Sequence, residues 1–210
     1  MKLLAVAVAR WDLARLMRAI VAAVIAVMPA AAWPLDFYGI EIGKPMTYPE
    51  CATRTIGVTT LYPFPFPTEE PCFMDVTKPG RPVSDGMVNV RWPLERGPKY
   101  AAGEIYARIK GGIVQRVSMS TDGAATQQDL FAELTRKFGK PQVNERHAVR
   151  TALGAKYTAI KAGWVTGDYV VVFEGIGFTV DGGSLEVYTR AAWDAEKADE
   201  RKNETKRPRM

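Results

Sequence analysis

In the middle of the chain, apolar and polar residues alternate with a period of two, which is typical of half-buried β-strands. Two runs of this kind, Glu104–Lys110 and Ile113–Ser120, lie on either side of Gly111-Gly112 and predict a hairpin. A two-residue turn would mix apolar and polar side chains on one face, so we expect a three-residue loop that also includes Lys110. The expected register brings together Ile109 with Ile113, and Ile105 with Val117.

A second hairpin is predicted by Tyr157–Thr166 and Tyr169–Ile176, which flank the dipeptide Gly167-Asp168. A two-residue turn at this dipeptide places apolar residues opposite one another and also forms a pair of opposite charges. The expected pairs are Trp164 with Val171, Ala162 with Phe173, and Lys161 with Glu174. Because the apolar face and the charge pair agree, we expect this register.

Three further runs predict single strands. Phe37–Ile42 is closed by a glycine and a proline, and Met87–Trp92 ends at Pro93. Ser184–Arg190 alternates after a glycine-rich turn at 181–183.

One helix is predicted in the second half of the chain. Thr126 is a candidate N-cap with Asp129 three residues later, a variant of the capping box. Gly139 suits the helix exit, and Pro141 prevents continuation. The apolar residues at helical spacing are Leu130, Phe131, Leu134 and Phe138.

The order of hairpin, helix, hairpin and strand predicts an α+β fold, an antiparallel β-sheet of hairpins with one main helix packed on one face. Leu134 and Phe138 should face the sheet, close to Trp164 or Ile105. Residues 33–190 contain no repeat and no linker, so we expect a single α+β domain.

The first 32 residues are typical of a signal peptide rather than of a folded segment. Basic residues precede the apolar run Ala19–Val27, Pro29 ends it, and Ala30–Ala32 offers small side chains for cleavage after Ala32. The run is shorter than the roughly 20 residues of a membrane-spanning helix, so we expect membrane contact only through the uncleaved signal peptide. Translation could start at Met1 or at Met17, which would open a more ordinary signal peptide.

Cleavage would change the charge of the protein. The chain has a formal net charge of +5 and a pI near 9.2. Four basic residues and one acidic residue belong to the signal peptide, so the remainder carries about +2. A basic patch for nucleic acid is therefore not expected, and we predict no nucleic-acid partner.

Cys51 and Cys72 are the only cysteines, and an oxidising compartment would join them in a disulfide. Between them, residues 60–67 alternate proline with large side chains, which predicts an extended loop. The partner-binding candidates on this loop are Tyr62, Phe64 and Phe66. In the alternative, these rings fold back and cover an open side of the sheet.

The chain carries no recognisable catalytic or metal-binding motif. His147 is the one histidine and lies in a polar stretch, and no Gly-x-Ser-x-Gly elbow is present. Bonded cysteines can serve neither as nucleophiles nor as zinc ligands. We therefore expect no catalytic residue, no metal and no cofactor. A hydrolase of an envelope polymer that uses two carboxylates is the enzyme alternative, because two acids need no motif.

Two segments resemble small exported bacterial α+β proteins, most of them uncharacterised. One is the motif Gly39-x-x-Ile42-Gly43-x-Pro45, which runs on to Cys51. The other is the helix exit Leu134–Pro141, followed by a strand that carries Trp164. The helix exit is also similar to that of small outer-membrane assembly lipoproteins, but the chain lacks their lipidated cysteine, so no role is transferred. The resemblance implies an exported α+β protein and no particular activity.

The last residues, 191–210, predict the start of a short helix at Ala191-Ala192-Trp193 and a disordered charged tail from Lys197 onward.

Together these features predict a periplasmic or secreted protein that binds a protein or a cell-envelope component and does not catalyse a reaction. A structural or inhibitory subunit that adds a strand to its partner is a further alternative. An apolar patch around residues 62–66 would favour the binding protein. A long acid-lined cleft would favour the hydrolase, and an unpaired sheet edge would favour the structural or inhibitory subunit.

Overall fold

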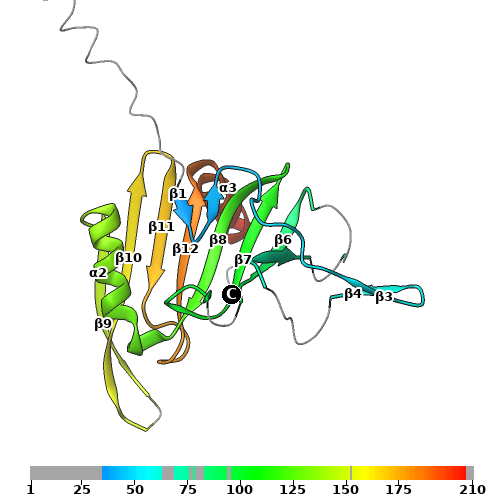
Figure 1. Cartoon of the computed structure of the whole chain (residues 1–210). Coiled ribbons are helices and arrows are strands. Elements are labelled where there is room, and N and C mark those ends of the chain that lie inside the picture. Colours follow the sequence, from blue (N-terminus) through cyan, green and yellow to red (C-terminus); the bar gives the residue numbers. More distant parts are fainter. Residues whose placement is uncertain are drawn as a thin grey trace, which may run out of the picture. The chain divides into compact units, whose positions relative to one another are not determined.

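The computed structural model describes residues 35–62, 69–75, 78, 83–93, 96–151 and 153–206 (Figure 1). All of them belong to one unit, Pro34–Met210. The predicted signal peptide (1–32) lies outside the described residues, as do Phe64 and Phe66. Within the described part of the chain, no helix has both the length and the apolar content of a transmembrane span.

An antiparallel sheet of eight strands forms the centre of the fold, in the order β5-β6-β7-β8-β12-β11-β10-β9. Along the chain the strands make two runs, β5 to β8 and β9 to β12, and β12 pairs with β8 to join them. The strands are β5 (Cys72–Met74), β6 (Gly86–Arg91), β7 (Ala101–Lys110), β8 (Ile113–Thr121), β9 (Val143–Arg150), β10 (Lys156–Thr166), β11 (Tyr169–Glu174) and β12 (Gly183–Thr189). The broad α+β prediction is confirmed, and so are the strands predicted at 87–92 and 184–190, to within one residue at each end.

The predicted register of hairpin β10–β11 is confirmed. Trp164 lies opposite Val171, and Lys161 lies opposite Glu174. Trp164 and Val171 are both fully buried, so the face chosen by the apolar pattern is the one that joins the core.

The predicted register of hairpin β7–β8 is wrong. Lys110 pairs with Ile113, which leaves a two-residue turn of Gly111 and Gly112, with φ of 57° and 75°. Positive φ at both positions is the requirement of the tight hairpin turn that matches strand twist. A register shift after Arg108 then leaves Gln115 without a partner in the ladder. The observed apolar pairs are Ile109 with Val114, Ala107 with Val117, and Ile105 with Met119. This bulge, rather than a longer loop, keeps the apolar residues on one face.

The first predicted strand, 37–42, is instead a small hairpin. It consists of β1 (Leu35–Phe37) and β2 (Ile40–Ile42), which pair around Tyr38 and Gly39. The Tyr48 hydroxyl donates a hydrogen bond to the carbonyl of Tyr38 at 2.7 Å. A Cβ atom at Gly39 would lie 2.0 Å from that hydroxyl oxygen, so only glycine fits this turn. The hairpin buries Ile40 and Ile42 of β2 in the main core.

Helix α2 (Gln127–Phe138) carries the predicted apolar stripe. Leu130 and Leu134 belong to the main core, and the rings of Phe131 and Phe138 lie 6.0 and 6.3 Å from the Trp164 ring. The Trp164 indole N–H also donates to the Gly139 carbonyl at 2.8 Å, which ties the helix exit to β10.

The predicted N-cap is not formed. Thr126 has helical backbone angles and makes no capping hydrogen bond, because a turn of 3₁₀ helix, η2 (Gly123–Ala125), precedes it. Gln127 instead anchors the start of α2. Its buried amide donates to the Thr158 carbonyl at 3.1 Å and accepts from the Ile160 N–H at 3.2 Å. The helix is thus fastened to β10 at both ends.

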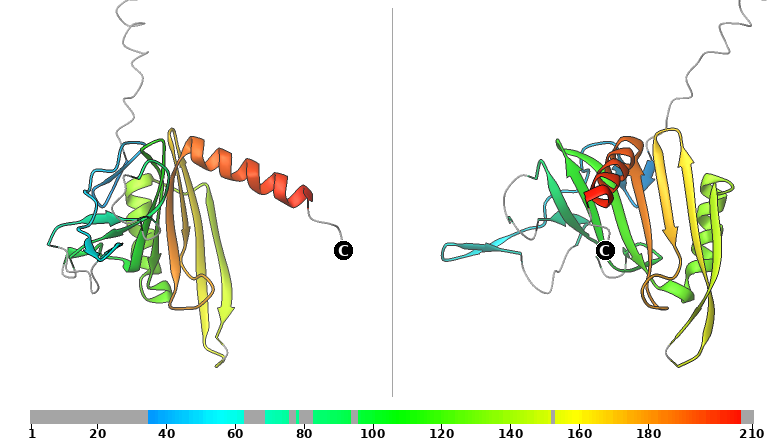
Figure 2. Two further views of the ribbon diagram at one scale, coloured as in Figure 1. Left: turned by 90° about the vertical axis from the view of Figure 1, so that its right-hand side faces the viewer. Right: turned by 180° about the vertical axis from the view of Figure 1, so that it is seen from behind.

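A second helix, α3 (Arg190–Lys206), includes the helix start predicted at 191–193 and continues to Lys206, where the sequence predicts a disordered tail. Residues 207–210 of that tail lie outside the described residues. Ion pairs at helical spacing, such as Arg190 with Asp194 and Lys197 with Glu200, support it along the surface. Trp193 packs against Tyr188 of β12, with 5.1 Å between the ring centres. The far part of the helix projects from the sheet (Figure 2), and no described side chain of α3 is fully buried. The described residues therefore contain two α-helices, α2 and α3.

Replacing Leu134 by alanine is expected to lower the free energy of unfolding by about 2–5 kcal/mol, because a side chain that is 5% exposed leaves a cavity in the core. Replacing the exposed Arg136, on the same helix, should change it by less than about 0.5 kcal/mol. Urea unfolding measures both variants. Equal losses of stability in the two variants would mean that the apolar residues of α2 face solvent rather than the core.

Candidate functional site

The predicted disulfide is confirmed. Cys51 and Cys72 are bonded, with 4.9 Å between their Cα atoms. The Cys51 N–H also donates to the Phe73 carbonyl at 2.7 Å, so the backbone and the disulfide hold the same two segments together. Met74 and the half-buried Tyr62 complete a small apolar cluster around the two sulfurs. A disulfide of this kind is consistent with a compartment outside the cytoplasm.

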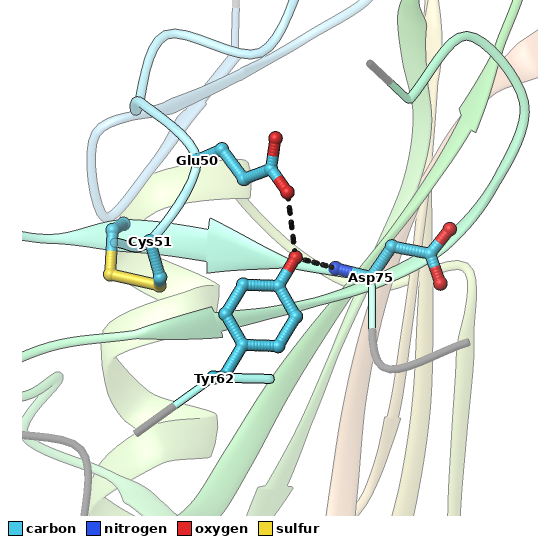
Figure 3. The surroundings of a disulfide bond; sticks show 5 residues. Glu50, Cys51, Tyr62 and Asp75 are labelled. Carbon is cyan, nitrogen blue, oxygen red and sulfur yellow. Dashed lines mark hydrogen bonds between the residues drawn. A yellow bond between two sulfur atoms is a disulfide. The ribbon is translucent and has the colours of Figure 1, made fainter. Parts of the chain in front are cut away.

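Tyr62 closes the other end of the disulfide-bonded segment (Figure 3). Its hydroxyl donates to a carboxylate oxygen of Glu50 at 2.7 Å and accepts from the Asp75 N–H at 3.2 Å. Burial, and then the hydrogen bond to Glu50, raises the pKa of Tyr62 to about 12, so the phenol stays protonated at neutral pH. Tyr62 therefore joins two parts of the chain that lie on either side of the Pro-rich segment.

The structure thus places one of the three predicted partner-binding residues. Tyr62 is partly exposed, but its hydroxyl is used within the protein. Phe64 and Phe66 lie outside the described residues, so their role in binding stays a prediction.

Between Cys51 and Tyr62 the chain forms a hairpin that the sequence analysis missed. Its strands are β3 (Arg54–Ile56) and β4 (Thr59–Leu61), which pair only with each other among the described strands. Gly57, with φ of 62°, makes the turn possible. The hairpin stands away from the eight-stranded sheet in both figures of the whole chain (Figures 1 and 2).

The hairpin exposes three apolar side chains, two of them at its turn. Ile56 is 60% exposed, Val58 103% and Leu61 47%. None of the three belongs to either apolar cluster of the described residues. An isolated two-stranded hairpin is only marginally stable in water, so the disulfide and Tyr62 at its base are needed to hold it. We use the name hairpin tip for Ile56 and Val58, at the turn, together with Leu61, which lies at the other end of β4 opposite Arg54.

His147 lies on β9 with its side chain exposed, opposite Ala159 of β10. Among the described residues, no three His, Cys, Asp or Glu side chains are grouped so that they could hold a metal ion.

A partly buried polar network joins the central strands β8 and β12 to α3. The Tyr188 hydroxyl donates to Glu186 at 2.6 Å and lies 3.3 Å from Glu196 of α3. Arg116 of β8 forms an ion pair with Glu186 and a longer one, at 3.6 Å, with Glu196. Burial, and next the hydrogen bond to Glu186, raises the pKa of Tyr188. The network fixes the start of α3 over β8.

Comparison of the chain with protein families, with curated proteins and with solved structures finds no match.

Replacing both cysteines by alanine is expected to lower the free energy of unfolding by about 3 kcal/mol, because the bond closes a loop with a sequence separation of 21. Limited proteolysis should then cut the variant within 52–71 before any other described segment. Wild-type protein treated with reductant is the matched comparison. Unchanged stability and unchanged cleavage in both samples would contradict a structural role for the disulfide.

Replacing Tyr62 by phenylalanine is expected to lower the free energy of unfolding by about 0.5–1.5 kcal/mol at neutral pH, since one hydroxyl serves two partners. Folding raises the pKa of Tyr62 from 10.0 to about 12, so the stabilisation is complete below about pH 10 and is lost as the pH rises to about 12. Urea unfolding of both proteins across this window should show their difference shrinking.

Tyr157→Phe is the control, because the described residues offer the Tyr157 hydroxyl no hydrogen-bond partner and the side chain is exposed. If the difference in free energy of unfolding between Tyr62→Phe and wild type did not change with pH, deprotonation of Tyr62 would be ruled out as the cause of the loss of stability at high pH.

Proposed function

We propose that the protein is exported to the periplasm or the extracellular space and acts by binding another protein, without catalysis. The hairpin tip is the surface that we assign to this binding. The observation that carries the proposal is the exposure of Ile56, Val58 and Leu61 on a hairpin fastened at its base by Cys51–Cys72.

Exposed apolar side chains of this size are a liability in a protein that has no partner for them. A single exposed residue needs no explanation, but three within six positions on one projecting element do. The disulfide and the Tyr62 hydrogen bonds fix the hairpin base before binding. Less conformational entropy is then lost when a partner binds, which supports recognition rather than a passive loop.

The chemistry of the hairpin favours a protein over a lipid surface. Elements that bind anionic membranes combine apolar residues with several lysines or arginines. Within 50–62, Arg54 is the one basic residue, and Glu50 offsets its charge. The two strands of the hairpin pair only with each other among the described strands, so neither outer edge has a described strand beside it. Such edges can add a strand from a protein partner.

The test begins with a photo-crosslinking amino acid at Val58, used in cells that export the protein, to identify the partner by mass spectrometry. With the purified partner, the triple variant Ile56→Ser, Val58→Ser, Leu61→Ser should bind at least about 30-fold more weakly than wild type, as expected for residues at the centre of an interface. Its melting temperature should stay within about 2 °C, because exposed side chains contribute little to folding.

The matched control is Leu153→Ser with Phe178→Ser, which removes side chains that are 98% and 106% exposed elsewhere on the surface. It should bind like wild type. Equal affinities for the triple variant and the control would sink the assignment of the hairpin tip.

A further inference from the structure

A groove of about 500 Å³ lies between α3 and the outer side of β7 and β8. This volume is within the range of about 300–1,000 Å³ that is usual for small-ligand sites. The hairpin tip does not contribute to it. The charged residues that line it are Arg108, Lys110, Arg116, Glu196, Asp199 and Glu200.

The floor of the groove is basic. Arg108 of β7 lies directly opposite Arg116 of β8. Like charges in this position destabilise a sheet unless they are neutralised. Glu186 and Glu196 neutralise Arg116. Arg108 and, two residues on, Lys110 are exposed and have no ion-pair partner among the described residues.

The wall of the groove is acidic. Glu196, Asp199 and Glu200 lie at positions i, i+3 and i+4 of α3, so they share one side of the helix. Asp199 and Glu200 have ion pairs only with lysines of the same helix among the described residues. These pairs are exposed, and exposed pairs contribute about 0–1 kcal/mol, so a ligand can replace them.

Among the described residues, the basic floor and the acidic wall of the groove form an ion pair at one point only. That point is the contact of Arg116 with Glu196, at 3.6 Å, near the anchored start of α3. Farther along the helix, no described pair joins Asp199 or Glu200 to Arg108 or Lys110. The groove is lined by three basic and three acidic side chains, so its lining is balanced in charge while its charges are separated in space.

We propose that this groove binds a short peptide with free ends, a ligand class distinct from the protein partner of the hairpin tip. The peptide's carboxylate pairs with Arg108 and Lys110, and its ammonium group pairs with Asp199 and Glu200. Arginine recognises carboxylates through two parallel hydrogen bonds, which gives this end its specificity. The alanines of α3 that line the groove, Ala191, Ala192 and Ala195, supply the apolar surface for the peptide backbone and small side chains.

A ligand of one charge fits this site less well. A simple anion would be attracted by Arg108 but repelled by the carboxylates of α3. A simple cation would be attracted by those carboxylates but repelled by Arg108. Direct closure of α3 onto β7 is the other way to pair these charges, and it would exclude the peptide.

Isothermal titration calorimetry of the signal-peptide-free protein with Ala-Ala-Ala tests the proposal. We expect binding at millimolar or lower concentration, weakened about tenfold or more by N-acetylation or by C-terminal amidation of the tripeptide. In the variant Arg108→Gln, Lys110→Gln, amidation should no longer change the affinity. In the variant Asp199→Asn, Glu200→Gln, acetylation should no longer change it.

The control variant is Lys161→Gln with Arg201→Gln, which removes exposed charges on β10 and α3 outside the groove lining. It should bind all three peptides like wild type, and circular dichroism should show that every variant keeps its helix content. The proposal is overturned if the free tripeptide does not bind at millimolar concentration, or if blocked and free tripeptides bind equally well. Non-binding together with a lower melting temperature of both groove variants would instead indicate direct closure of α3.

Discussion

The pairing of β8 with β12 is the interaction on which the rest of the structure depends. It joins two runs of strands that the chain forms separately, with Val117 and Val187 as buried partners at the centre of the sheet. Because β12 leads directly into α3, the same pairing places that helix over β8 and β7. Loss of this pairing would divide the sheet and remove one wall of the groove.

Local patterns predict those parts of the fold in which two signals agree. In β10–β11, the apolar face and the pair of Lys161 with Glu174 require the same register, and the structure has it. In β7–β8, a longer loop and a tight turn followed by a bulge both keep the apolar residues on one face. The alternation of residues cannot distinguish them. The two glycines with positive φ, and the position of Gln115 outside the β7–β8 ladder, show that the chain adopts the second solution.

The candidate sites are less accessible to sequence reasoning, because they depend on contacts between distant segments. Tyr62 looks like an exposed aromatic residue until Glu50 and Asp75 are placed beside its hydroxyl. Strands as short as β3 and β4 contain too few residues to show a period. Helix α3 lacks an apolar stripe, and its side toward the groove is acidic, so hydrophobic periodicity gives no signal there.

The distribution of apolar side chains decides where binding can occur. One face of the sheet is covered by α2 and by β2, whose Leu130, Ile40 and Ile42 belong to the main core. On the other face, Tyr106 and Arg108 lie together because the side chains of β7 alternate between the two faces. Strand pairing places Asn89 of β6 opposite Tyr106, and Met74 of β5, beside the disulfide, opposite Asn89. That face therefore has the disulfide cluster at one edge and α3 near its centre. Because α2 and β2 occupy part of the first face, the groove beneath α3 offers a ligand a way to contact the sheet from the second face.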